Sequence, residues 1–553
     1  MSIVTEEVFA AAHSRDAGLI TGTLDNPIRR SWRQIYRSAT HVAGALADLG
    51  VGAGDRVAVL AGQPSEIAPL IEGIWMRGVS ITMLHQPTPR TDLAQWMADA
   101  LTVIGMISAR LVVVGAPFTP AADVFAGQGV RSVSCEELLN GSATEPVPTG
   151  EDDIALLQLT SGSTGTPKAV IVTHGNLAEH NHGMAKAAKL DPGSDISVSW
   201  LPLSHDMGMV GLLIAMQLGI EAVCVTPSDF LESPLSWPAL ITKYRATVTL
   251  APNFAYSLLA HRLDQAPDGA YDLSSLRVAF NGAEPVDAGA VARFIQSGSR
   301  FGLRPTAMAP AYGMAEATLS VSIAVDGVDI DAIDPAALEN DARAVVSTAD
   351  DARQLVKLGP PLPCVEARVV DFGRSPLPAR GIGEIELRGT SLSRGAVTTS
   401  GLEATFDDDG WLATGDLGYL TEAGDIVVCG RKKDMIIVGG RNIFPADIER
   451  VASTVAGVRP GSATAVRLAG KELSEEFGLA IESKAYSDPA EVARIRAELS
   501  TRVLAAFGVS PRFVMVTGPG TLPKTPSGKV RRAETVALIE AELARVRESD
   551  SVV

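Results

Sequence analysis

The sequence predicts an α/β protein: a large N-terminal domain of parallel α/β sheets with a small β-barrel-like part, then a small α+β domain. Three observations predict this class. Short apolar runs alternate with helical segments from residue 30 to about residue 285, strand-rich sequence begins near residue 364, and a compact mixed unit begins near residue 440. The 553 residues suffice for roughly three or four packing units.

The first alternation lies between residues 30 and 115. Residues 31–50 place apolar side chains at helical spacing and end on Gly50, a residue that commonly terminates helices. Residues 55–62 and 80–87 are short apolar runs closed by turn residues, which is typical of buried parallel strands. This pattern predicts strand and helix in alternation from near the start of the chain.

The alternation resumes at residue 155 with a strand, a Gly-rich loop, a second strand and a helix from about Asn176. Further strands and one helix are predicted at 222–227, 235–244, 247–253 and 276–285. Loops open where strands end, after residue 159, at 251–253 and at 281–285. Because ligands of α/β sheets collect at the carboxyl ends of strands, we expect these loops to converge on one site.

The rest of the chain divides into three parts. Residues 326–357 are acidic, Ala-rich and poorly periodic, which predicts a surface excursion. Strands and a hairpin are predicted between residues 364 and 430, and a helix at 533–548 ends the mixed unit. We therefore predict two domains, residues 1–430 and residues 431–553. No period of 20 to 50 residues recurs, which argues against a repeat array.

Composition and charge limit the function classes. The net charge of −17 argues against a nucleic acid as partner. Residues 431–553 carry 19 Lys and Arg against 15 Asp and Glu, whereas residues 1–430 carry 28 against 49, so a mildly basic part follows a large acidic one. Four scattered Cys predict free thiols, and neither a signal peptide nor a membrane span is apparent, so we expect a cytoplasmic protein.

The stretch LTSGSTGTPK, residues 159–168, cannot fill a core or complete a helix face. Gly permits close backbone approach to a ligand, and hydroxyl, N–H and ammonium groups bind phosphate. The sequence differs from the G-x-x-x-x-G-K-[ST] phosphate-binding motif, because Lys168 follows Gly162 after five residues and is preceded by Pro167. Taken alone, the stretch is equally well an ordinary Gly/Ser loop.

Six other stretches accompany it in order: LHQPTPRTDL (84–93), WLPLSHDMGM (200–209), APNFAY (251–256), FNGAEPV (280–286), YGMAEAT (312–318) and GRNIFP (440–445). Over roughly residues 30–535 the chain resembles the adenylate-forming superfamily of acyl-CoA synthetases, luciferases and adenylation domains. Within that superfamily these stretches resemble the mycobactin-type fatty acyl-AMP ligases. Ala169 departs from the family pattern, which has Gly after the Lys, and SRGAVTTSG after residue 392 lacks an aromatic pair often seen there.

The resemblance implies ATP and Mg²⁺ as cofactors and assigns their binding residues. Glu316 and Thr164 would bind Mg²⁺, a cation that prefers oxygen ligands. Tyr312 would stack on adenine, Asp416 would accept the ribose hydroxyls, and Arg431 would contact ribose or phosphate. The full ATP set is Thr160, Ser161, Gly162, Ser163, Thr164, Gly165, Lys168, Asn281, Gly282, Ala283, Glu284, Tyr312, Gly313, Met314, Ala315, Asp416 and Arg431.

The resemblance also assigns catalytic, hinge and acyl-binding residues. Lys529 would be the mobile catalytic lysine, and His205 would lie beside the acyl carboxylate and orient it. Lys433 would be the pivot about which the C-terminal domain turns. The acyl pocket is assigned to Met209, Phe254 and Tyr256. Taken alone, a lone His is more often structural, and the apolar run from residue 207 to 219 is a core helix.

The implied function is ATP-dependent activation of a fatty acid to acyl-AMP, then transfer of the acyl group to an acyl carrier protein. A fatty acyl-CoA ligase that uses coenzyme A is the nearest alternative. Fatty acyl-AMP ligases typically carry an insertion that disfavours the CoA-competent arrangement, and residues 326–357 are a candidate for it. A non-catalytic binding homologue is disfavoured because Lys529, Glu316, Asp416 and the Gly-rich loop are all present.

Overall fold

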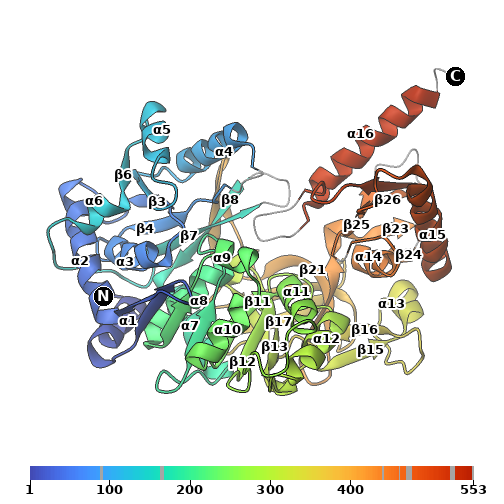
Figure 1. Cartoon of the computed structure of the whole chain (residues 1–553), viewed down its shortest axis with the longest axis horizontal. Coiled ribbons are helices and arrows are strands. Elements are labelled where there is room, and N and C mark those ends of the chain that lie inside the picture. The colour runs from blue at the N-terminus through green and yellow to red at the C-terminus, as the bar shows by residue number, and fades with distance from the viewer. Residues whose placement is uncertain are drawn as a thin grey trace.

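The computed structural model describes residues 1–87, 91–161, 167–438, 441–459, 461–468, 476–523 and 530–550. Two eight-stranded sheets form the large N-terminal part. One is parallel from β7 (Ile154–Ser161) to β6 (Ser132–Ser134) and antiparallel from β7 to β20 (Gly401–Ala404), and the other is parallel in the centre with an antiparallel strand at each edge. The chain runs from the blue α1 end to the red α16 end in Figure 1. The predicted α/β class with parallel sheets is confirmed.

The first sheet has the order β20-β19-β8-β7-β4-β3-β5-β6. Its strands are β3 (Arg56–Leu60), β4 (Ser80–Met83), β5 (Leu111–Val114), β6 (Ser132–Ser134), β7 (Ile154–Ser161), β8 (Pro167–Thr173), β19 (Gly395–Thr398) and β20 (Gly401–Ala404). Its helices are α2 (Trp32–Asp48), α3 (Pro64–Trp75), α4 (Leu93–Met106), α5 (Ala121–Gly127) and α6 (Cys135–Leu139). The predicted helix α2 begins with a capping box between Ser31 and Gln34, and Gly50 after its end adopts φ of 70°.

The second sheet has the order β14-β13-β12-β11-β9-β10-β1-β2. Its strands are β1 (Gly18–Gly22), β2 (Pro27–Ser31), β9 (Ile196–Ser199), β10 (Glu221–Cys224), β11 (Val248–Pro252), β12 (Val278–Gly282), β13 (Met308–Gly313) and β14 (Ser320–Ile323). The remaining helices of this part are α1 (Ile3–Ser14), α7 (His174–Ala187), α8 (Asp206–Leu218), α9 (Pro227–Glu232), α10 (Ser236–Tyr244), α11 (Asn253–Leu263) and α12 (Ala288–Ser299). One hydrophobic core joins the two sheets.

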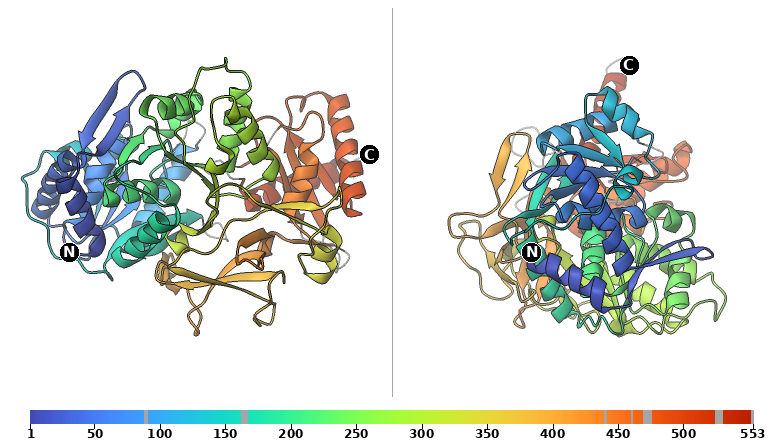
Figure 2. Two further views of the ribbon diagram at one scale, coloured as in Figure 1. Left: turned by 90° about the horizontal axis from the view of Figure 1, so that it is seen from below. Right: turned by 90° about the vertical axis from the view of Figure 1, so that its left-hand side faces the viewer.

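A four-stranded antiparallel sheet lies along one side of the two large sheets, seen in yellow and orange in both views of Figure 2. It consists of β17 (Val365–Val370), β18 (Gly383–Gly389), β21 (Leu412–Leu420) and β22 (Ile426–Arg431). The predicted hairpin at 419–430 is the β21–β22 pair. This sheet matters for function because its last two strands carry Asp416 and Arg431.

The C-terminal part has its own hydrophobic core from Ile436 onward. Its elements are β23 (Ile436–Val438), β24 (Arg441–Ile443), α14 (Pro445–Ser453), β25 (Ala463–Leu468), β26 (Glu476–Glu482), α15 (Pro489–Phe507), β27 (Phe513–Thr517) and α16 (Arg532–Asp550). The excursion predicted at 326–357 is more ordered than its sequence suggested, with β15 (Ile330–Ile333), α13 (Pro335–Asp341) and β16 (Arg353–Val356). It packs against β24 (Figure 1).

Candidate active site

The ends of β11 and β12 bring the APNFAY and NGAE stretches together. The fully buried Asn281 donates from Nδ2 to Asn253 Oδ1 at 3.1 Å, and Phe254 N–H donates to Glu284 Oε1 at 2.5 Å. Ala283 adopts φ of 67°, which is a strained left-handed conformation for a residue with a Cβ. Within the described residues Asn281 Oδ1 has no hydrogen-bond partner, so it offers a buried acceptor at the strand end.

Asp416 is the centre of a charged cluster formed by three separate segments. Tyr312, at the end of β13, donates its hydroxyl to Asp416 Oδ2 at 2.6 Å, and Arg431 Nε lies 2.8 Å from Oδ1. Burial raises the pKa of Asp416, and the charge of Arg431 and the hydroxyl of Tyr312 oppose that rise. The structure therefore joins three residues that the sequence assigned separately to the nucleotide. A carboxylate has about four lone-pair sites, so these two donors leave room for two ribose hydroxyls.

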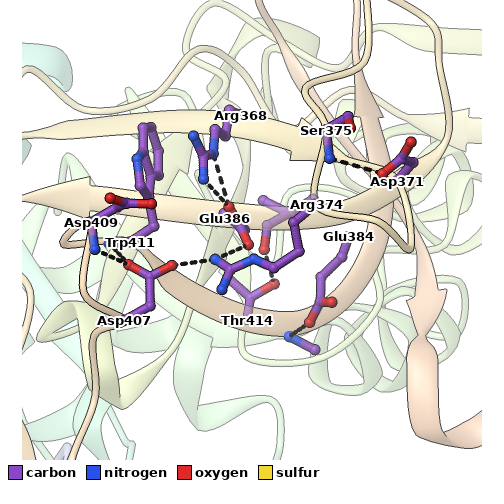
Figure 3. A network of polar contacts seen from close by, with 12 residues as sticks. Arg368, Asp371, Arg374, Ser375, Glu384, Glu386, Asp407, Asp409, Trp411 and Thr414 are labelled. Carbon is purple, nitrogen blue, oxygen red and sulfur yellow. Dashed lines mark hydrogen bonds and ion pairs between the residues drawn. The ribbon is translucent and has the colours of Figure 1, made fainter.

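The strand that carries Asp416 is held by a polar network on the four-stranded sheet (Figure 3). The buried Glu386 binds Arg368 at 2.7 Å and Arg374 at 2.6 Å, and Arg374 also pairs with Asp407. Thr414 donates to Ile385 O at 2.7 Å, and Glu384 accepts from Gly415 N–H at 3.2 Å. These contacts fix the two residues before Asp416, so its position is set by the sheet.

The YGMAEAT loop closes between β13 and β14 through a short 3₁₀ turn. Met314 N–H donates to Leu319 O, and Thr318 adopts φ of 67°. The loop is also pinned from outside, because Ser393 N–H donates to Glu316 O at 2.8 Å and Thr318 Oγ1 donates to Ser391 O at 2.7 Å. The half-buried Glu316 is thus presented from a constrained backbone.

The phosphate stretch connects β7 to β8, and Thr160 pairs with Lys168 across the two strands. Gly162, Ser163, Thr164 and Gly165 lie outside the described residues, as does the side chain of Ser161. Gln158 Nε2 donates to Ser204 O at 3.2 Å, which joins this strand to the residue before His205. The strand that leads into the phosphate stretch therefore lies beside the residue before His205.

His205 is the N-cap residue of α8. Its Nδ1 lies 2.6 Å from Asp206 Oδ1, whereas the bond from Met207 N–H to the same Nδ1 is longer at 3.4 Å. The shorter contact requires a proton on Nδ1, so Asp206 orients the ring. A proton on Nε2 as well would let the ring donate to a carboxylate substrate.

His85, after β4, was not assigned from the sequence. Burial lowers the pKa of His85 to about 4, and the positive charges of His205 and Arg531 make smaller contributions in the same direction. Arg531 belongs to the C-terminal part, two residues after Lys529, which itself lies outside the described residues. Arg531 and His205 therefore both lie near His85. The sequence offered no signal for His85 beyond its place in the LHQPTPR stretch.

The three residues assigned to the acyl pocket lie in different surroundings. Met209 is fully buried in α8. Tyr256 is also fully buried, donates its hydroxyl to Phe280 O at 2.8 Å, and packs on Trp237 and Phe294. Phe254 is half-buried, with its ring edge-on to Trp200. Phe254 and Tyr256 both contact the FNGAEPV segment, Phe254 through Glu284 and Tyr256 through Phe280 O.

The described residues contain no group of three or more His, Cys, Asp or Glu that could hold a metal ion by themselves. Mg²⁺ that travels with ATP needs only one or two carboxylates, because phosphates and waters complete its shell. Glu316 fits that requirement. Lys433, which the resemblance assigns to the hinge, is exposed in the 3₁₀ turn Lys432–Asp434 that follows β22. No helix in the described part of the chain is long and apolar enough to cross a bilayer.

A model of the AMP-binding enzyme family matches residues 7–396. The chain is 52% identical to the putative ligase Rv1013 of Mycobacterium tuberculosis, over 98% of this chain and 100% of that protein. It is 31% identical to the putative fatty-acid–CoA ligase fadD25 of the same species, over 92% and 91%. It is 33% identical to the medium-chain-fatty-acid–[acyl-carrier-protein] ligase TtuA of Teredinibacter turnerae, over 74% and 65%.

The fold also matches a solved structure from a study of fatty acyl-adenylate ligases of E. coli and L. pneumophila. The TM-score is 0.89 at 29% identity, and the match covers 98% of both chains.

Proposed function

We propose that this chain, an adenylate-forming fatty-acid ligase, transfers the activated acyl group to the phosphopantetheine thiol of an acyl carrier protein. The chain belongs to the AMP-binding enzyme family. The observation that carries the nucleotide site is the Tyr312–Asp416–Arg431 cluster, because it gathers an aromatic ring, a carboxylate and a guanidinium from distant segments. The unpartnered Asn281 Oδ1 supports it, since an adenine amino group is a donor.

In the first step a fatty-acid carboxylate oxygen attacks the α-phosphorus of ATP, an acyl–O–P bond forms, and pyrophosphate leaves. His205, oriented by Asp206, binds the second carboxylate oxygen and holds the nucleophile in place. Lys529 stabilises negative charge on the phosphate oxygens. Mg²⁺, when bound at Glu316, neutralises charge on the phosphates. Tyr312, Asp416 and Arg431 fix the nucleoside, so the attack proceeds from a defined geometry.

In the second step the thiol of the acceptor attacks the acyl carbon, a thioester forms, and AMP leaves with the electron pair of the broken C–O bond. A thiol can reach that carbon only after the segment near Lys529 withdraws. A turn of the C-terminal domain about Lys433 would achieve this. The exposed position of Lys433 between β22 and β23 is compatible with such a pivot.

The carrier-protein acceptor is supported by how the excursion meets the C-terminal part. The buried Arg353 of β16 lies 3.0 Å from Asp447 of α14, donates to Cys429 O at 3.0 Å, and faces the ring of Phe444 at 4.8 Å. Apolar side chains from the excursion, β21, β22 and the start of the C-terminal part pack in the same place: Ile333, Leu338, Tyr419, Cys429, Met435 and Phe444. An element anchored in this way restricts the turn of the C-terminal domain without preventing it, as an insertion that disfavours the CoA-competent arrangement would.

The alternative acceptor is coenzyme A. The relative fadD25 is named a fatty-acid–CoA ligase, whereas TtuA is named an acyl-carrier-protein ligase, so relatives of both kinds exist. The two functions share the first step and every residue assigned to it.

The experiment that tests the activation step uses purified protein with ATP, Mg²⁺ and fatty acids of graded length. Acid-dependent release of pyrophosphate with accumulation of acyl-AMP is the expected result. Release of inorganic phosphate, or no release with any acid, would contradict the proposed function.

A further inference from the structure

One face of α7 supports the YGMAEAT loop and the residue that follows it. Asn176 Nδ2 donates to Thr390 O at 2.8 Å and to Leu392 O at 3.1 Å, and the 390–393 segment in turn binds Thr318 and Glu316. One turn further along the same face, the fully buried His180 accepts a hydrogen bond from Ser320 N–H at 2.9 Å. One helix therefore supports the loop that presents Glu316, through the 390–393 segment at its middle and through His180 just after its C-terminal end.

The bond from Ser320 fixes the protonation of His180. A backbone N–H can only donate, so Nε2 of His180 must be unprotonated, and in the neutral ring the proton is on Nδ1. Nδ1 then donates to Asn181 Oδ1 at 3.0 Å. Burial lowers the pKa of His180 to about 4, so the ring stays neutral at physiological pH. A neutral ring in one tautomer is a rigid acceptor for the loop.

The chain of hydrogen bonds continues outward and defines every amide orientation. Asn181 Nδ2 donates to Gln217 Oε1 at 2.7 Å, and Gln217 Nε2 donates to Glu7 Oε2 at 2.6 Å. Because a backbone donor stands at one end and an acceptor-only carboxylate at the other, no amide along the chain can be reversed without losing a bond. Asn181 and Gln217 are buried, so such a loss would leave an unsatisfied group.

The position of α7 connects this hydrogen-bond network to the proposed nucleotide site. The helix follows β8 directly, with Thr173 as its N-cap, and β8 is the strand that leads out of the phosphate stretch. One rigid element thus connects β8 to the loop of Tyr312 and Glu316. We propose that His180 is a positioning residue, which holds the Glu316 loop in register with β8 for binding of MgATP. The inference rests on the proposed function, whose nucleotide site it extends.

The test compares His180→Leu with His180→Gln. Leu has a similar size without an acceptor, whereas the Oε1 of Gln can reach Ser320 N–H. We expect the Kd for MgATP, measured by calorimetry, to rise about tenfold in His180→Leu, equivalent to about 1.4 kcal/mol. In pyrophosphate exchange the KM for MgATP should rise equally, while the KM for the fatty acid stays within twofold. His180→Gln should restore most of the affinity.

His182→Ala is the matched control on the same helix, because His182 is exposed and contacts the network at its outer end, at Glu7 and the side-chain amide of Gln217. It should leave the affinity for MgATP within twofold of wild type. A folded His180→Leu variant with wild-type affinity would overturn the proposal, and so would equal losses for MgATP and fatty acid.

Two further measurements keep the test decisive. If His180→Leu does not fold, His180→Asn replaces it, since the shorter amide stops short of Ser320 and should weaken MgATP binding as Leu would. Nitrogen-15 spectra of the native protein should show His180 as the Nδ1–H tautomer, and an Nε2–H tautomer would overturn the proposal. If the wild type activates no fatty acid, the proposed function fails, whereas MgATP binding still decides the role of His180.

Discussion

The hydroxyl of Tyr312 lies 2.6 Å from a carboxylate oxygen of Asp416, although 104 residues separate the two in the chain. The bond joins the sheet that carries β13 to the antiparallel sheet that ends at Arg431. Arg431, on the other side of the same carboxylate, is the last residue of β22. In the proposed function, nucleoside binding and the strand before the hinge would therefore be linked through one buried carboxylate.

Two substitutions separate the ribose contact from the Tyr312 contact. Asp416→Asn should lower kcat/KM for ATP about 100-fold, since the amide cannot accept from Arg431 and two hydroxyls, and a hydrogen bond to a charged group is worth roughly 1.5–3 kcal/mol. Tyr312→Phe keeps the ring and should cost less than about tenfold. Steady-state kinetics with ATP varied would check this. Equal losses in the two variants would show that Asp416 serves only to hold Tyr312.

Glu316→Gln should raise the Mg²⁺ concentration needed for half-maximal pyrophosphate exchange by roughly tenfold, because a neutral amide is a weaker ligand for a hard cation. The backbone carbonyl of residue 316 would still accept from Ser393, so the loop should keep its shape. The measurement is a Mg²⁺ titration at fixed ATP. An unchanged titration would refute the role of Glu316.

Lys529→Ala should reduce acyl-AMP formation about 10²–10³-fold or more, since it removes a positioned cation from the developing phosphate charge. Lys524→Ala, in the same stretch of sequence, serves as the control and should retain activity. Circular dichroism would confirm that both variants are folded. Normal acyl-AMP formation in Lys529→Ala would contradict the assignment.

Arg353→Met should destabilise the protein by roughly 2–4 kcal/mol, because it leaves Asp447 short of a partner in a mostly buried site. It should also increase transfer to coenzyme A relative to a carrier protein, since the excursion then holds the C-terminal part less firmly. Arg293→Met, which breaks an exposed pair with Asp264, is the control and should change both quantities little. An unchanged acceptor ratio would show that residues 326–357 do not control the choice of acceptor.

Glu72→Gln should change how stability depends on pH. Glu72 is buried in α3, neither carboxylate oxygen has a hydrogen-bond partner within the described residues, and burial raises its pKa to about 8. The unfolded chain loses this proton near pH 4.5, whereas the folded chain keeps it until about pH 8, so the wild-type free energy of unfolding should fall across that window.

At about 1.4 kcal/mol per pH unit the loss amounts to a few kcal/mol, and the Gln variant should lack it. Melting temperatures of the two proteins should therefore agree near pH 4.5 and diverge toward pH 8, with the variant higher. Parallel curves over this range would mean that Glu72 is ionised in the folded protein.

The sequence predicted the elements that repeat a simple pattern. The helix at 31–50 and the apolar strands of the parallel sheets follow from periodicity and stop signals, and the β21–β22 hairpin follows from its turn. The meeting of the loops at 251–253 and 281–285 also followed, because parallel strands place their carboxyl ends along one edge, whereas the loop after residue 159 lies outside the described residues and its part in the site stays a prediction.

Other features depend on neighbours that are distant in the chain. Residues 326–357 are short polar elements, and Arg353 is buried only because α14, about 90 residues later, packs over it. His85 and His180 are single histidines without a motif of their own, so only their surroundings distinguish them from ordinary structural residues. Lys529, the residue on which the resemblance depends most, lies outside the described residues and stays a prediction.

The central claim is tested most directly by presenting the acyl-AMP with both acceptors in one reaction. Purified protein with ATP, Mg²⁺ and a fatty acid that it activates would receive coenzyme A and a phosphopantetheinylated carrier protein at equal concentration, and mass spectrometry would measure both thioesters. We predict acylation of the carrier with little acyl-CoA. Acyl-CoA as the main product would contradict the carrier-protein acceptor and make the chain a fatty acyl-CoA ligase.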